Sequence, residues 1–349
     1  MSDFVRRMSM VIVVLVLAAC SGAAEDQSAS STTDESEGSN GGSEASAASG
    51  VSTEGMQVAY ASDLDPNDVA DQFGIQEAGA EVTALTEDSA VAAGLNNGDF
   101  DIGNIDATAA IKAVQGGVPL TIVYVSQTTP EFVMVSQPEI TDFDQLAGQT
   151  VAYHSPGSLT EIVQRELVRQ YDSALEDQID WTVLPESPNR ASAMAADRIQ
   201  ATSLEFLDVA ALQEEDDYNV LGSWGDLEGE SANALATTWV VADSYLDENR
   251  DQVVAFLQHV QDGYDAVYED KDGWTAMATE TLPDVDQARL GEAYDYYTDI
   301  GMYPQNGEPP VTEQTWEEMD AFFRQIGEYD QTASPDMVDF ETVTEVAGN

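Results

Sequence analysis

The chain has 349 residues, of which 66 are Asp or Glu and only 11 are Lys or Arg, so its formal net charge at pH 7 is −55. This charge excludes nucleic acids and anionic membrane surfaces as partners, because both require clustered basic residues. Self-repulsion on this scale disfavours a compact state in dilute buffer, whereas at molar salt the Debye length falls to about 3 Å. The acidic residues are spread over the chain, and we interpret them as the solvated surface of a salt-adapted, halophilic protein.

The first residues have the pattern of an export signal. Arg6 and Arg7 precede a short apolar run, residues 10–17, which is too short to span a bilayer. The run leads into Leu17-Ala18-Ala19-Cys20, which resembles a bacterial lipobox and contains the only cysteine of the chain. We therefore expect a lipoprotein signal peptide over 1–19 and lipid attachment at Cys20, with an ordinary cleaved signal as the alternative. The protein would then be extracytoplasmic and would touch the membrane only through its lipid. Either the general secretory or the twin-arginine route could export it.

Residues 20–55 are rich in Ser, Ala, Gly, Glu and Asp and contain almost no large apolar side chain. Such a segment cannot bury enough surface to offset its ordering entropy, so we expect a disordered acidic tether. About 295 residues remain, which is enough for two ordinary domains.

Beyond the tether, short apolar runs alternate with amphipathic segments. We expect strands at 56–61, 81–85, 101–103, 120–125, 132–135, 150–153, 180–184, 199–204, 219–222 and 237–241. We expect helices at 68–79, 89–95, 107–114, 159–171, 189–197, 246–268, 273–281, 284–300 and 313–326. Strands that alternate with helices predict an α/β protein with parallel sheets.

Four stretches carry a resemblance to a known family. They are residues 95–103 (LNNGDFDIG), 116–120 (GGVPL), 140–152 (ITDFDQLAGQTVA) and 187–201 (SPNRASAMAADRIQA). In this order and spacing they are similar to the nitrate/sulfonate/taurine-binding family of ABC importer components, which also includes binders of thiamine precursors. Gln149, Asp197 and Gln200 depart from the lysine, glycine and aspartate that the family usually has there, which weakens ligand assignment by analogy.

The resemblance implies a two-lobed periplasmic-binding-protein type II fold. Lobe 1 would comprise 56–131 and 242–349, and lobe 2, residues 136–236, would be inserted between them. Crossover strands at about 132–135 and 238–241 would form the hinge. The implied function is the substrate-binding component of an ABC importer, which holds a small polar solute in the interlobe cleft and delivers it to a permease and an ATPase. We expect a monomer.

Residues of the loops at the ends of the expected strands are the candidate ligand contacts, because ligands of open α/β sheets lie beyond the carboxyl ends of strands and near helix N-termini. This rule selects Asp65, Asn104, Asp106, Gln127, His154, Ser155, Gly157, Ser158 and Glu205.

Two interpretations stay open for the loop at 155–158. Its free N–H groups, at the start of the expected helix 159–171, could bind the anionic or polar head group that the resembled family commonly places here. Alternatively, Ser158 and Glu161 form a capping box that satisfies some of these donors internally.

The acidic candidates also have two interpretations. Asp65, Asp106 and Glu205 could belong to the solvated acidic surface. If two of them line the cleft, a cationic or amine-bearing ligand is favoured. Arg190 is expected to support its lobe from its helix rather than to bind the solute.

Catalysis is not expected, and neither are a cofactor or a metal. His154 and His259 are the only histidines and are assigned to different lobes, and Cys20 would carry lipid, so no Cys/His cluster or Cys–His nucleophile can form. The alternatives are an enzyme of the same fold that acts on a pyrimidine precursor, whose cysteine-rich motif is absent here, and a ligand-sensing lipoprotein.

Overall fold

The structure is a computed structural model that describes residues 51–61, 65–85, 87–229, 234–283 and 285–348. The expected signal peptide, Cys20 and most of the expected tether lie outside the described residues. The last part of the expected tether belongs to the folded region, because Thr53 is buried and its hydroxyl donates to the Ala78 carbonyl at 2.7 Å.

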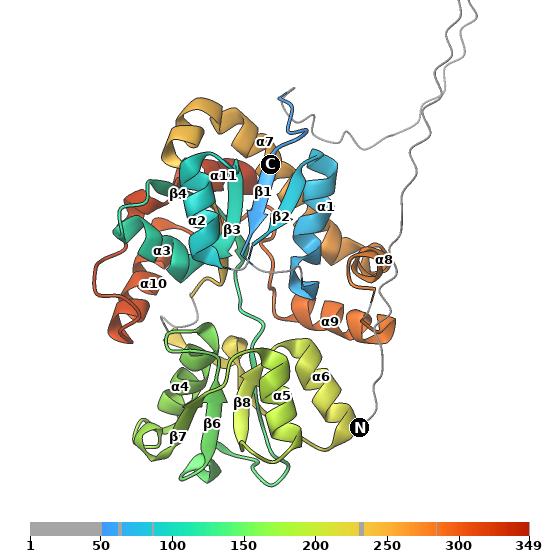
Figure 1. Cartoon of the computed structure of the whole chain (residues 1–349), viewed down its shortest axis with the longest axis vertical. Coiled ribbons are helices and arrows are strands. Elements are labelled where there is room, and N and C mark those ends of the chain that lie inside the picture. The colour runs from blue at the N-terminus through green and yellow to red at the C-terminus, as the bar shows by residue number, and fades with distance from the viewer. Residues whose placement is uncertain (1–50, 62–64, 86, 230–233, 284, 349) are drawn as a thin grey trace, which may run out of the picture. The chain divides into compact units, whose positions relative to one another are not determined.

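One five-stranded sheet, called sheet A below, has the strand order β2-β1-β3-β10-β4 (Figure 1). Its strands are β1 (Gln57–Tyr60), β2 (Glu81–Ala84), β3 (Ile102–Asp106), β4 (Leu120–Gln127) and β10 (Thr237–Ala242). Strand β1 pairs in parallel with β2 and β3, whereas β10 is antiparallel to both β3 and β4.

The other five-stranded sheet, sheet B, has the order β7-β6-β8-β5-β9. Its strands are β5 (Val133–Ser136), β6 (Thr150–Tyr153), β7 (Asp180–Val183), β8 (Ala201–Leu204) and β9 (Asn219–Ser223). Strand β6 is parallel to β7 and β8, and β5 is antiparallel to β8 and β9.

The expectation of parallel sheets is therefore wrong at β5 and β10, whereas β9 runs in the same direction as β8, because both are antiparallel to the strand β5 between them. Strands β5 and β10 each enter a sheet directly from a strand of the other sheet, and no βαβ crossover, which would impose a parallel direction, precedes them. The predicted α/β class is confirmed, with two mixed sheets. The predicted lobe boundaries and hinge stay a prediction.

The helices are α1 (Val69–Ala78), α2 (Asp88–Asn97), α3 (Ala107–Gln115), α4 (Leu159–Asp172), α5 (Ser187–Ala195), α6 (Phe206–Glu215), α7 (Asp243–Glu269), α8 (Lys271–Thr281), α9 (Gln287–Asp299), α10 (Glu313–Gln325) and α11 (Phe340–Ala347). Helices α6 and α11 were not expected from the sequence. Within the described ranges, none of the helices is both long enough and apolar enough to cross a membrane.

Helices α1 and α7 cross at very short range. A Cβ atom added to Gly74 would lie 2.3 Å from the carbonyl oxygen of His259, and one added to Gly263 would lie 2.7 Å from the carbonyl oxygen of Ala70. The two backbones approach this closely because neither glycine has a side chain. This crossing fixes α1, and the 3₁₀ turn η1 (Pro66–Asp68) directly before α1 carries residues of the site described next.

Candidate solute-binding site

A pocket of about 150 Å³ lies at one edge of sheet A. Tyr60 lines it from the end of β1, residues 104–106 from the end of β3, and Gln127 from the end of β4. Thr237, the first residue of β10, pairs with both Asp106 and Gln127, so the antiparallel strand starts where its neighbours end. Leu159, the first residue of α4, lines the same pocket. The pocket is therefore lined both by residues of sheet A and by the helix that follows β6.

The charged lining of this pocket is entirely acidic. Five carboxylates line it, those of Asp65, Asp68, Asp88, Asp106 and Glu131. Among the described residues, no Lys, Arg or His lines it. In their ionised forms these carboxylates attract cations and repel anions.

Asp88 and Asp106 are directly linked. The Asp88 carboxylate accepts a hydrogen bond from the Asp106 backbone N–H at 3.2 Å. Burial, followed by the charge of Asp88, raises the pKa of Asp106 to about 7, although the Lys112 ammonium opposes this shift. Burial also raises the pKa of Asp88. Because the Lys112 ammonium also forms an ion pair with Glu328, the positive charge that opposes this shift is partly neutralised.

Glu131 lies on the connection from sheet A to sheet B and is only 6% exposed. Its carboxylate accepts from the Phe206 backbone N–H at 3.2 Å, at the start of α6, and from the Tyr297 hydroxyl at 3.0 Å, on α9. The Phe206 ring also stacks on Tyr296 of α9, with ring centroids 4.4 Å apart. Burial raises the pKa of Glu131 to about 7, and the charges of Asp65 and other acids add to the shift. Glu131 thus ties one wall of the pocket to α6 and α9.

Three polar atoms around the pocket are buried without a hydrogen-bond partner in the described part of the chain: Asn67 Oδ1, Asn104 Nδ2 and Thr237 Oγ1. Asn104 as a whole is only 5% exposed. An unsatisfied buried polar group costs about 1–3 kcal/mol, so such groups are rare in folded proteins. Three of them lie around this one pocket.

Four of the residues selected from the sequence, Asp65, Asn104, Asp106 and Gln127, line this pocket together. Asn104, Asp106 and Gln127 lie inside β3 and β4 rather than in the loops that the sequence predicted, because both strands extend further than expected.

The other five selected residues do not line this pocket. Gly157 lines a different pocket of about 310 Å³, and His154, Ser155, Ser158 and Glu205 line neither. The His154 Nδ1 atom accepts from the Glu186 N–H at 3.2 Å. Glu205 is linked to the first pocket through charge, since burial, followed by the charges of Glu131 and Asp65, raises its pKa to about 8. A ligand-binding role for these five residues stays a prediction.

The N–H groups of the loop at 155–158 are largely satisfied internally. The Ser155 N–H donates to Ser158 Oγ at 3.3 Å, and the Gly157 N–H donates to the Glu161 carboxylate at 2.7 Å. Ser158 Oγ also accepts from the Glu161 N–H at 3.4 Å, as an N-cap should. The geometry favours capping over an anion site, and the Glu161 carboxylate would itself repel an anion.

Sequence reasoning missed Asn67, Asp68, Asp88, Glu131 and Thr237. Asp88 follows β2, so the rule of strand ends could have found it. Thr237 lies at the start of β10, and only the antiparallel direction of that strand brings it to this edge. No local pattern distinguishes Glu131, whose position depends on contacts with α6 and α9.

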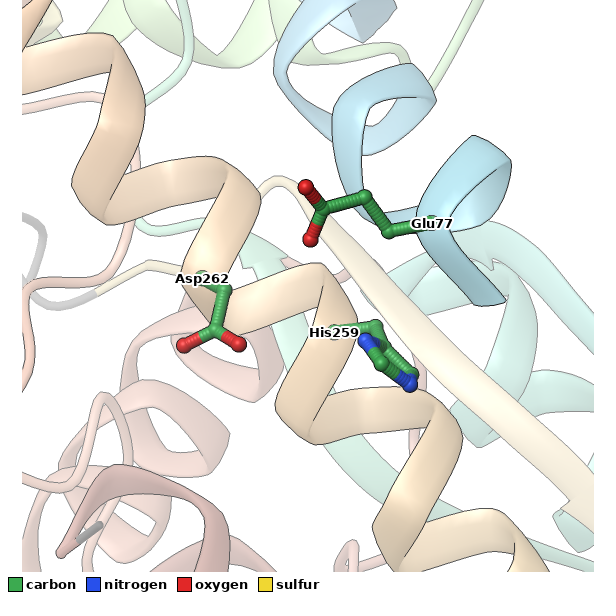
Figure 2. Close-up of side chains that lie close together, drawn as sticks. All are labelled: Glu77, His259 and Asp262. Carbon is green, nitrogen blue, oxygen red and sulfur yellow. The ribbon is translucent and has the colours of Figure 1, made fainter. Parts of the chain in front are cut away.

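A second group of potential ligands lies at the crossing of α1 and α7. Figure 2 shows Glu77 from α1 beside His259 and Asp262 from α7, and one ligand atom from each lies within 4.8 Å of the others. Nitrogen and carboxylate ligands in this number suit a divalent cation such as Zn²⁺. The sequence analysis missed the group because it considered only clusters of Cys and His. Glu77 and Asp262 are exposed, and no unpartnered buried atom of the described residues belongs to this group, so proximity alone supports it.

Residues 75–273 match the family model named NMT1/THI5 like, which is more than half of the chain. The chain belongs to the NMT1/THI5-like family. This confirms the family that the four sequence stretches indicated. No curated protein matches the sequence significantly.

Solved structures resemble this family member in fold at low sequence identity. The ligand-binding component of an ABC-type import system from Staphylococcus aureus, with zinc bound, has a TM-score of 0.66 and 15% identity, over 85% of this chain and 100% of its own. The periplasmic aliphatic sulphonate binding protein SsuA from Escherichia coli has a TM-score of 0.61 and 16% identity, over 83% and 91%. A Candida albicans protein with the generic periplasmic binding protein fold has a TM-score of 0.57 and 15% identity, over 84% and 96%. The predicted periplasmic-binding-protein fold is confirmed.

Proposed function

We propose that this protein is the extracytoplasmic solute-binding component of an ABC importer and that it holds a small polar solute in the pocket at the edge of sheet A. The observation that carries the proposal is the set of unpartnered buried atoms on Asn67, Asn104 and Thr237, since these need partners that the described chain does not supply. The import-system and sulphonate-binding functions of the Staphylococcus aureus and Escherichia coli proteins support it.

The contacts around Glu131 supply a physical route from binding to delivery. Its segment joins sheet A to sheet B, lines the pocket, and bonds to both α6 and α9. A solute that touches residues on both sides of this connection binds one arrangement of the two sheets more tightly than the others. Binding therefore increases the population of that arrangement. The permease and ATPase would respond to that arrangement, with the protein held at the membrane through lipid on Cys20.

The proposal is tested by thermal shifts in molar salt with nitrate, taurine, alkanesulfonates, thiamine precursors and small amines. Saturable binding at about 100 times the dissociation constant should stabilise the protein by about 2.7 kcal/mol. No shift with any of these solutes would contradict the proposal, and so would the appearance of a product after incubation, since we propose binding without turnover.

Two matched Thr→Val variants locate the bound solute. Thr237→Val removes the unpartnered hydroxyl, so it should leave stability unchanged or slightly higher while weakening solute binding about fivefold, the worth of one hydrogen bond. Thr202→Val removes a buried hydroxyl of β8 that donates to the Ala152 carbonyl at 2.9 Å. It should lower stability by about 1 kcal/mol and leave affinity unchanged. Equal affinities of wild type and Thr237→Val would place the solute elsewhere.

A further inference from the structure

The charges around the pocket select the class of solute. The carboxylates that line it come from η1 and the residue before it, from α2, from β3 and from the segment after β4, and they surround a small and partly buried space. At short range, and with little water, like charges repel far more strongly than at an open surface. Nitrate or a sulfonate would therefore meet strong repulsion here, and the described lining offers no basic side chain to offset it.

The uncharged polar and aromatic groups of the pocket limit the class of solute further. Asn67 Oδ1 is an acceptor that lacks a donor, and Asn104 Nδ2 is a donor that lacks an acceptor. The aromatic residues Tyr60 and Phe132 also line the pocket, and aromatic residues can attract cations. An engineered cavity of about 150 Å³ holds one benzene molecule, so the present pocket suits a solute of roughly six non-hydrogen atoms.

We propose that the solute is a small organic cation whose ammonium group binds between Asp106 and the neighbouring carboxylates and whose hydroxyl or carbonyl oxygen accepts from Asn104. The inference rests on the proposed function, because it concerns the solute of the same pocket.

Binding of such a cation is coupled to proton release. The charged groups that act on Asp106 are Asp88 on α2 and Lys112 on α3, and the carboxylates of Asp65, Asp68 and Glu131 line the same pocket. Since the pKa of Asp106 in the free protein is raised to about 7, mainly by burial, this carboxyl group holds a proton below that pH. An ammonium ion requires the charged form, so its affinity should fall about tenfold per pH unit below about 7 and level off above. An anion would show the opposite dependence.

The test is calorimetric titration of the full chain in molar salt between pH 5.5 and pH 8.5. Four probes share a two-carbon backbone and differ in their terminal groups: ethanolamine is cationic, ethylene glycol is neutral, taurine is zwitterionic and isethionate is anionic. Choline and putrescine extend the cationic set. We expect saturable binding of at least one cation, with the pH dependence above, and none of isethionate. Asp106→Asn should weaken that binding at least tenfold and make it less dependent on pH, with Glu131 as the remaining titrating group, whereas Asp99→Asn, an equal charge change at an exposed turn, should do neither.

The outcomes separate this inference from the proposed function. Binding of isethionate, nitrate or a neutral solute without binding of any cation would overturn the cationic class and leave the proposed function standing. Absence of binding by every solute of both panels would overturn both. Cation binding that Asp106→Asn does not change would overturn the assignment to this pocket.

Discussion

The crossing of α1 and α7 offers a sharp test of the packing. In Gly74→Ala the new methyl carbon would lie 2.3 Å from both the carbonyl oxygen of His259 and the Cα atom of Val260, about 1 Å closer than contact allows. Both atoms belong to backbone, so the helices must move apart. Overpacking of this kind costs about 3 kcal/mol, and the better helix propensity of Ala returns about 1 kcal/mol. We expect a net loss of about 2 kcal/mol, or a Tm lower by about 4–8 °C.

Gly291→Ala is the matched control for this variant. Gly291 also lies inside a helix, α9, but the atom nearest to its added Cβ would be Lys271 Cε at 3.9 Å, an ordinary contact. Only the propensity gain applies, so Tm should rise by about 2–4 °C. The assay is thermal unfolding followed by circular dichroism in molar salt. If Gly74→Ala were as stable as Gly291→Ala, the close approach of α1 and α7, and with it the support of the pocket turn η1, would be refuted.

Three further predictions concern charge. Burial raises the pKa of Asp106 to about 7, above its unfolded value of about 3.9, so its contribution to stability is lost as pH rises through 7. Asp106→Asn should therefore raise Tm at pH 8 and leave it unchanged at pH 4, and thermal scans showing a lower Tm at pH 8 would contradict the burial of this acid. Wild-type Tm should rise steeply between about 0.1 M and 1 M KCl, where the Debye length falls from about 10 to about 3 Å, and a salt-independent Tm would argue against the salt-adapted surface. Arg190 is 1% exposed, and its guanidinium group donates to a carbonyl oxygen in β8 at 3.0 Å and to one just after β7 at 3.3 Å. Arg190→Met should therefore lower the free energy of unfolding, measured by denaturant titration, by about 2–4 kcal/mol. The ion pair of Arg289 is largely exposed, so Arg289→Met should cost under about 1 kcal/mol, and equal costs would contradict the supporting role of Arg190.

Part of the candidate site was predictable because it depends on local rules. Strand ends follow from the apolar runs of β1, β3 and β4, and ligands gather at the carboxyl ends of such strands. This reasoning selected Asp65, Asn104, Asp106 and Gln127, which line one pocket. The same rule selected the loop at 155–158, where the structure places a capped helix start instead, because side chains of that loop reach its own N–H groups.

The amino-acid sequence by itself determined the order and type of nearly all strands and helices, the family, and the acidic character of the whole chain. These depend on residue type and short-range periodicity, which act between neighbours along the chain. Tertiary structure alone decided that β10 runs antiparallel and brings Thr237 beside Asp106, that Glu131 meets α6 and α9, and that a few buried polar atoms remain unpaired. Such features depend on which distant segments pair and how closely they pack, and no local pattern contains that information.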